Sequence, residues 1–325
     1  MRRTEKAVVA PTLIEIRRAA ERIQTHAHRT PVLTCASLDR EVGAQIFLKC
    51  ENLQKVGAFK FRGACNAVFS LPETVAARGV VTHSSGNHAQ ALALAARLCG
   101  IPAYIVMPDS APAVKKAAVA GYGGKITFCR PTLEARESTL ARLAAETGAT
   151  VVHPYNNYEV IAGQGTAALE LLQAFPDLEV IVAPIGGGGL MSGTAIAAKE
   201  LSPNIRVIGA EPERADDAFR SLASGRIIPS INPQSIADGL LASLGNLTFP
   251  IIQKHVEQIV TVSEAGIVAA MKFVWERAKI IIEPSAAVAV GTLWERKIDL
   301  TDRRVGVILS GGNVDLDRLP WQGKQ

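Results

Sequence analysis

Ala58-Phe59-Lys60-Phe61-Arg62-Gly63-Ala64 is the most informative stretch of this chain, because it sets one lysine between two aromatic residues where a strand is expected to become a helix. Residues 45–49 before it are mostly apolar, and the apolar residues of 64–71 recur at helical spacing. Burial beside the rings would disfavour the ammonium, lower the pKa of Lys60 and leave an amine suited to Schiff-base chemistry. The alternative is a solvated ammonium whose stem lies over the rings.

The length and composition of the chain favour an α/β enzyme of two domains. Its 325 residues exceed a usual single core, and 48% of them are hydrophobic while only 5% are aromatic. The net charge of +5 is spread along the chain without a basic run, which argues against nucleic-acid binding. No apolar run is long enough for a bilayer, and no secretory apolar region follows the charged start, so we expect a soluble, cytoplasmic protein without a membrane partner. The five cysteines form no Cys-x-x-Cys pair and are expected to be buried thiols of a reducing compartment.

Strand and helix patterns alternate along two parts of the chain. A first amphipathic helix is predicted over residues 12–28, ended by Thr30-Pro31. Strands separated by helices predict parallel sheets with right-handed crossovers. The predicted strands are 80–82, 103–107, 125–128 and 150–153 in one series, and 180–184, 206–210, 259–262 and 305–309 in the other. We therefore predict two open, twisted, mainly parallel sheets flanked by helices, with a small domain (72–150) inserted into a large one (1–71 and 151–325).

Three loops at predicted strand ends carry groups that bind small ligands. Gly186-Gly187-Gly188-Gly189 joins a buried strand to a helix, where backbone amides and the helix dipole suit a phosphate, although glycines also let a strand and a helix pack closely. The loop Thr82-His83-Ser84-Ser85-Gly86-Asn87-His88 offers more donors for a carboxylate than a simple N-cap needs. Ser310-Gly311-Gly312-Asn313 is either a third ligand loop or a tight turn.

In their order along the chain, these motifs resemble those of the tryptophan-synthase-β type (fold type II) of pyridoxal-phosphate enzymes. The match is closest to the family of serine racemases and threonine, serine and 3-hydroxyaspartate dehydratases, and it runs over nearly the whole chain. Further matching phrases are His153-Pro154-Tyr155, residues 161–166, Ala210-Glu211-Pro212, Ala237-Asp238-Gly239 and Ile282-Glu283-Pro284. The resemblance implies pyridoxal 5'-phosphate as cofactor, held mainly by the large domain, with a small domain that binds the substrate.

The resemblance also assigns roles to individual residues. Lys60 would hold the cofactor covalently and, once displaced by the substrate amine, remove the α-proton. Ser310 would face the pyridine nitrogen of the cofactor. A serine hydroxyl need not protonate that nitrogen, so the cofactor ring would be a weaker electron sink and a long-lived carbanion would be disfavoured. Rapid loss of a β-substituent from the substrate is then the favoured reaction. Ser85, on the face of the α-carbon opposite Lys60, would permit racemisation. The other cofactor-binding residues would be Phe59, Asn87, Gly186, Gly187, Gly188, Gly189 and Glu283, and the substrate-binding residues would be Ser84, Ser85, Gly86, Asn87, His88, Arg136 and Tyr155.

Three positions bear on the choice of substrate. Arg136 matches an arginine near the far end of the substrate in racemase-like enzymes, and its guanidinium suits the second carboxylate of 3-hydroxyaspartate; the alternative is a solvated arginine on a charged helix. Tyr155 and Ala242 stand where racemases tend to carry smaller or more polar side chains, which favours a dehydratase. Threonine, serine and 3-hydroxyaspartate all stay open.

Glu211, Ala215 and Asp217 predict a cation site. Two carboxylates with a backbone carbonyl between them suit Mg²⁺, or else Ca²⁺ or Mn²⁺, and the resemblance implies a structural cation there. The alternative is that these acids only favour the start of a helix.

We therefore expect a pyridoxal-phosphate-dependent ammonia-lyase that converts a β-hydroxy-α-amino acid to a 2-oxo acid and ammonia by β-elimination. The alternative is a serine or amino-acid racemase that uses Lys60 and Ser85, and one enzyme could have both activities. A non-catalytic binding protein is disfavoured because every matched cofactor position holds a competent residue. The resemblance implies a homodimer that acts on a small amino acid.

Overall fold

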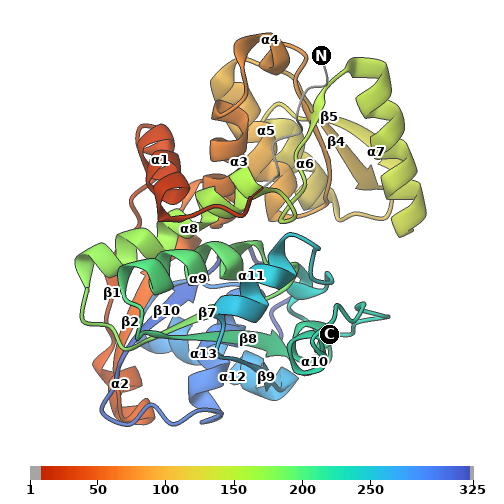
Figure 1. Ribbon diagram of the computed structural model, residues 1–325. Helices are drawn as coiled ribbons and strands as arrows, with labels where there is room; N and C mark the ends of the chain where they lie inside the picture. Colours follow the sequence, from red (N-terminus) through yellow and green to blue (C-terminus); the bar gives the residue numbers. More distant parts are fainter. Residues whose placement is uncertain (1–8, 323–325) are drawn as a thin grey trace.

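The computed structural model describes residues 9–322, which form two lobes (Figure 1). Each lobe has its own sheet: a six-stranded sheet of order β1-β2-β10-β7-β8-β9 in the large lobe and a four-stranded sheet of order β5-β4-β3-β6 in the small lobe. Every neighbouring pair is parallel except β1 and β2. The predicted fold class, two mainly parallel sheets flanked by helices, is confirmed.

The large sheet is covered on both faces. Its strands are β1 (Val32–Leu33), β2 (Gln45–Cys50), β7 (Val180–Pro184), β8 (Arg206–Pro212), β9 (Gln258–Val262) and β10 (Arg304–Leu309). One face of the sheet is covered by α1 (Leu13–Ile23), α8 (Tyr158–Ala174), α9 (Gly189–Leu201) and α11 (Thr248–His255). The other face is covered by α2 (Ala36–Val42), α12 (Glu264–Arg277) and α13 (Pro284–Trp294). Helix α10 (Asp217–Ser224) packs beside β9. Along β7, Ile181 and Val182 accordingly face opposite cores, which explains why this strand is apolar throughout.

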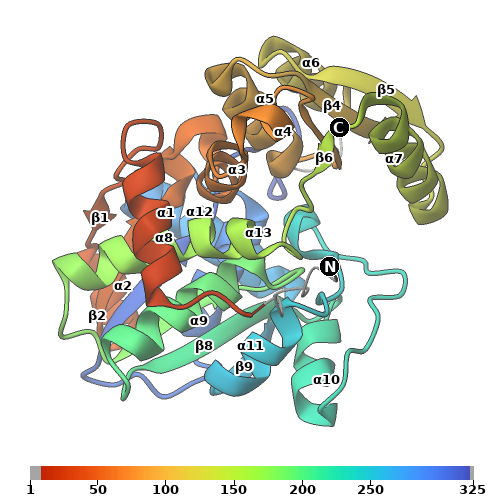
Figure 2. The same ribbon diagram turned by 45° about the horizontal axis from the view of Figure 1, so that its top comes forward.

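The small lobe, coloured orange to yellow-green, lies above the large one in both views (Figures 1 and 2). Its elements are α4 (Glu73–Ala76), β3 (Val80–His83), α5 (Asn87–Cys99), β4 (Ala103–Pro108), α6 (Ala113–Gly121), β5 (Lys125–Cys129), α7 (Leu133–Thr147) and β6 (Thr150–Val151). Helix α3 (Lys60–Phe69) packs on α5 of this lobe and on α8 of the large lobe, so it joins the two. The domain boundaries at 71/72 and 150/151 stay predictions; β6 lies across the second.

Short 3₁₀ helices occur in two connections, the one from β2 to α3 and the one from α10 to α11. They are η1 (Glu51–Leu53), η2 (Lys55–Gly57) and η3 (Asp238–Leu240). The predicted end of the first helix, at residue 28, was wrong, because α1 ends at Ile23. The backbone amides of His26 and Ala27 donate to the Ile23 carbonyl. The His26 ring stacks on the Phe69 ring with 4.1 Å between their centroids. The chain therefore turns here, and the helical pattern of the sequence does not reveal this turn.

Two further sequence-based expectations concern cysteines and membranes. All five cysteines lie within the described residues and are free, and Cys35, Cys50 and Cys65 are buried, whereas Cys99 and Cys129 are partly exposed. Across residues 9–322, no helix combines the length and the apolar character that crossing a membrane requires.

Candidate active site

Three neighbouring strands of the large sheet deliver the predicted site residues to one edge. Strand β2 leads through η1 and η2 to Lys60, β10 ends just before Ser310, and β7 ends just before the glycine loop, Gly186–Gly189. Because β2, β10 and β7 are parallel neighbours, their carboxyl ends meet. The Phe59 amide donates to the Ser310 carbonyl at 2.9 Å, which ties the start of α3 to the end of β10.

The amine of Lys60 lies against backbone and one aromatic ring. Its Nζ donates to the Pro154 carbonyl at 2.9 Å and lies 5.0 Å from the centroid of Phe59. Burial lowers the pKa of Lys60 to about 8, against the opposing effect of the Glu283 charge. The expected second ring is absent from this environment: Phe61 is buried in the core of the small lobe. Successive helical residues point about 100° apart, so residues 59 and 61 could not both flank residue 60 once α3 had begun.

An amide–carboxylate network joins the two lobes beside the lysine. Asn87 opens α5, and its Nδ2 donates to both Glu283 oxygens at 3.0 and 3.1 Å. The side-chain Nδ2 of Asn313 donates to the Asn87 Oδ1 at 2.9 Å, and the backbone N–H of Asn313 donates to Glu283 Oε2 at 3.1 Å. Burial raises the pKa of Glu283 to about 7. Asn313 was not among the predicted site residues, although it ends the Ser310–Asn313 motif and so carried a signal.

The glycine loop is a cradle without side chains. A Cβ on Gly187 would lie 2.3 Å from the Tyr155 ring, and one on Gly186 would lie 2.9 Å from the Leu240 Cα. Gly188 has φ +87°, a conformation that disfavours other residues. All four glycines are buried, and none of their amides donates a hydrogen bond to another residue in the described part of the chain. Buried donors of this kind require an acceptor from outside the protein.

The loop between β3 and α5 reaches the large lobe through Asn87, which binds Glu283 and Asn313. Ser84, Ser85, Gly86 and Asn87 are partly exposed, and the Ser84 Oγ accepts the Gly86 amide at 3.3 Å. His88 is buried with its Nε2 3.1 Å from the Val152 carbonyl, and burial lowers its pKa to about 3. His88 therefore holds the segment that leads to Pro154 and Tyr155.

Arg136 lies near the same loop but forms no hydrogen bond with it. Its Nε donates at 3.3 Å to the carbonyl of Thr132, the N-cap of its own helix α7. Burial and then the charge of Arg136 lower the pKa of His83. The ring of His83 makes an edge contact with His153 at 6.2 Å, and His153 makes one with Tyr155 at 4.6 Å. The charge of Arg136 thus acts on His83, the residue just before the Ser84–Asn87 loop.

Comparison with known proteins identifies the family. Residues 23–311 match the model of the family described as "Pyridoxal-phosphate dependent enzyme". The chain belongs to this family. It is 52% identical over 311 residues to the beta-hydroxyaspartate dehydratase of Paracoccus denitrificans (96% of this chain, 99% of the relative), and 50% identical over 312 residues to the serine racemase of Dictyostelium discoideum (95% and 96%). The crystal structure of that racemase aligns with a TM-score of 0.91 at 50% identity, covering 94% of this chain and 99% of the other.

The residues of this pyridoxal-phosphate dependent enzyme fit its cofactor. Four buried, unpaired amides at the start of α9 suit the phosphate, because the helix dipole adds positive potential there. An amine whose pKa lies near 8 suits attachment to the cofactor aldehyde. Ser310, a residue only 2% exposed, accepts the amide of Phe59 beside Lys60, and Asn87 binds Glu283, whose charge acts on the lysine. The individual roles of these residues stay predictions.

The predicted cation ligands lie on one short stretch, from the end of β8 to the start of α10. Glu211 and Asp217 are fully buried, and Ala215 lies on the turn between them. Glu211 accepts the amides of Ala218 at 2.9 Å and Phe219 at 2.8 Å, whereas neither Asp217 oxygen has a hydrogen-bond partner among residues 9–322. Burial raises the pKa of Glu211 to about 8 and that of Asp217 to about 6. No group of three or more His, Cys, Asp or Glu side chains gathers for a metal within that range, so a cation here would need carbonyl and water ligands as well.

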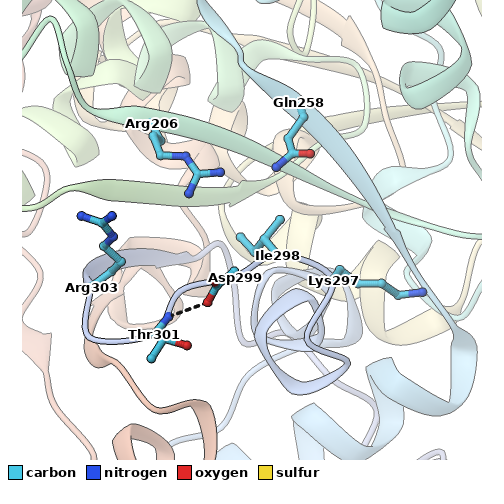
Figure 3. A pocket seen from close by; sticks show the side chains of 7 residues that line it. All are labelled: Arg206, Gln258, Lys297, Ile298, Asp299, Thr301 and Arg303. Carbon is cyan, nitrogen blue, oxygen red and sulfur yellow. Dashed lines mark hydrogen bonds between the residues drawn. The ribbon is translucent and has the colours of Figure 1, made fainter.

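A separate cavity of about 290 Å³ lies at the opposite edge of the large sheet (Figure 3). Arg206 and Gln258 line it from the first residues of β8 and β9, together with Lys297, Ile298, Asp299, Thr301 and Arg303. Its cationic side chains are already paired with acids: Arg206 with Glu257 at 2.9 Å, Lys297 with Glu295 at 3.3 Å, and Arg303 with Glu179. The cavity is thus remote from Lys60 and electrostatically satisfied.

Proposed function

We propose that this enzyme is an ammonia-lyase that dehydrates 3-hydroxyaspartate to a 2-oxo acid and ammonia. The carrying observation is the amine of Lys60, which donates to the Pro154 carbonyl and whose pKa is lowered to about 8, at the same sheet edge as Ser310. When bound, pyridoxal phosphate supplies an electron sink for the substrate's α-carbon, and a hydroxyl partner for its nitrogen keeps that sink weak. The Paracoccus relative, 52% identical, is named for hydroxyaspartate dehydration, which supports this substrate over threonine or serine.

The chain's own residues account for the movement of protons and groups. Near pH 8 about half of the Lys60 amines are neutral and able to accept the α-proton. The bond from the β-carbon to its hydroxyl then breaks, and the hydroxyl takes up the proton that Lys60 had accepted and leaves as water. Water then hydrolyses the released enamine to the 2-oxo acid and ammonia. The partly exposed loop of Ser84–Asn87, at the start of α5, would hold the substrate α-carboxylate with its N–H and O–H donors.

Arg136 would bind the second carboxylate of the substrate, because its charge acts on His83, which directly precedes the loop of Ser84–Asn87. A charge-assisted bond of about 1.5–3 kcal/mol predicts that Arg136→Ala lowers kcat/KM for 3-hydroxyaspartate by about 10- to 150-fold and leaves serine turnover nearly unchanged. Arg142→Ala, on the exposed face of the same helix, is the matched control. Both diastereomers of 3-hydroxyaspartate should be assayed for oxo acid and ammonia. Equal losses on serine and 3-hydroxyaspartate would reject the assignment.

A second activity, amino-acid racemisation, is supported by Ser85 and by the Dictyostelium relative named serine racemase. Ser85 lies in the partly exposed loop before α5, where its hydroxyl could exchange a proton with the α-carbon on the face opposite Lys60. Ser85→Ala should abolish formation of the D-isomer and largely spare elimination. Chiral chromatography of residual substrate measures this, and unchanged racemisation would contradict it.

We also propose that Glu211, Asp217 and the Ala215 carbonyl hold Mg²⁺, or Ca²⁺ or Mn²⁺, on the basis of the buried, unpaired Asp217. The large lobe would bind the cofactor and the small lobe the substrate. The enzyme would act as a homodimer in the cytoplasm, where its five free cysteines stay reduced. Light scattering tests the dimer, and a monomer at assay concentration would reject it.

A further inference from the structure

A largely buried cluster of four charges lies at the start of α3, the helix that Lys60 opens. The cluster consists of Arg62, Glu51, Glu170 and Lys49, and we call it the Arg62 cluster. Arg62 is fully buried, and its guanidinium binds Glu51 at 2.7 and 2.9 Å and Glu170 at 2.8 and 2.9 Å. Lys49 donates to Glu170 at 2.6 Å. Two positive and two negative groups thus balance, with both carboxylates held bidentately.

The cluster connects three elements that carry the site. Arg62 is the third residue of α3, Glu51 follows β2 directly, and Glu170 belongs to α8. Helices α3 and α8 also touch backbone to backbone: a Cβ on Gly163 would lie 2.7 Å from the Arg62 carbonyl. The Gly63 amide donates to the Gln164 side chain at 3.1 Å. Helix α3 therefore cannot slide along α8 without breaking the paired bonds of Arg62.

The relative position of α3 and α8 determines the surroundings of the amine. Lys60 opens α3, two residues before Arg62, and its Nζ donates to Pro154, which lies four residues before the start of α8. The neighbouring Tyr155 ring packs on the glycine loop. Both the donor and its acceptor are thus set by the contact that Arg62 makes between the two helices.

We propose that Arg62 is a positioning residue of the reaction: by bridging Glu51 and Glu170 it holds the Lys60 amine in place against Pro154 and the glycine loop. This inference rests on the role proposed for Lys60. Buried ion pairs add little net stability compared with apolar side chains of similar size, so stability alone gives no reason for an arginine here. Its planar fork, which lysine lacks, is what can bind two carboxylates at once.

The test uses Arg62→Lys, which keeps the charge and loses the fork, and Arg62→Met/Glu170→Gln, which removes one charge of each sign. Met271→Ala, in the core on the other face of the large sheet, controls for lost stability. For each holoenzyme we would measure the pH midpoint of the visible band of the lysine-bound cofactor, kcat and KM, and the thermal midpoint. We expect both Arg62 variants to shift the band midpoint by at least about half a pH unit and to lower kcat about tenfold or more with little change in KM.

Two outcomes separate this inference from the proposed function. Borohydride reduction of the wild-type holoenzyme and peptide mass spectrometry should place the cofactor on Lys60; a label on another residue would overturn the proposed function and this inference with it. If the label is on Lys60, the Arg62 variants are compared with Met271→Ala at equal loss of thermal stability. The positioning role alone is overturned if their band midpoint and kcat change no more than those of Met271→Ala. If Arg62→Lys fails to fold, the charge-balanced double variant decides by the same criteria.

Discussion

The reactivity of Lys60 in the cofactor-free enzyme is a direct measure of its environment. Burial lowers the pKa of its amine from 10.5 to about 8. At pH 7 a pKa of 8 leaves about 9% of the amines neutral, whereas a pKa of 10.5 leaves about 0.03%. The neutral, nucleophilic fraction at Lys60 should therefore exceed that of an ordinary lysine by about 300-fold. The folded state binds the proton of the Lys60 ammonium more weakly than the unfolded chain does. Lys60 therefore lowers the free energy of unfolding by a full, constant amount below pH 8, and this loss of stability shrinks as the pH rises from about 8 towards 10.5.

The assay is labelling with a limiting amine-directed reagent between pH 6 and 11, read by peptide mass spectrometry. The exposed Lys272 serves as internal standard for reagent consumption. The labelling midpoint of Lys60 should lie near 8. In Glu283→Gln the midpoint should move lower, because the Glu283 charge favours the ammonium form in the wild type.

Two results would refute this reasoning. A Lys60 midpoint at or above 10.5 would mean that the amine is solvated, and its proposed role as the base near neutral pH would fail. A rise of the midpoint in Glu283→Gln would mean that the carboxylate does not act on the amine as inferred.

Three further predictions concern other parts of the molecule. Gly187→Ala should weaken cofactor binding by about 10- to 100-fold in an absorbance titration, because its Cβ would lie 2.3 Å from the Tyr155 ring; unchanged affinity would contradict the cradle. Mg²⁺ should raise the thermal midpoint of the chelator-treated wild type but not that of Asp217→Asn, and equal responses would exclude Asp217 as a ligand. Lys115→Met should lower the free energy of unfolding by less than about 1 kcal/mol, and not at all at high salt, because the 2.6 Å salt bridge from Lys115 to Asp238 between the lobes is partly solvated. Denaturant titration measures this, and a loss of more than about 2 kcal/mol would contradict it.

The parts of the site that sequence could predict are those set by local pattern. A tetraglycine between a buried strand and a helix, and a Ser-Gly-Gly-Asn turn after another strand, both identify strand ends. Parallel strands then place such ends at one edge, whatever the distance along the chain. The direction of a side chain near a helix start is not set in this way. Phe61 lies in the small-lobe core and not beside the amine because α3 begins at Lys60, and the pattern alone does not place that first residue.

The pairing of Arg62 with Glu51 and Glu170 shows a different limit, because Glu170 lies 108 residues away and on another helix. Local sequence nevertheless carried a signal. Residues 61–68 are buried on every face of α3, as a run of small and apolar residues indicates. An arginine inside such a helix cannot reach water, so it must have carboxylate partners in the core. Few acids lie on otherwise apolar segments, and Glu170, between Leu169 and Leu171 on the largely buried α8, is one of them.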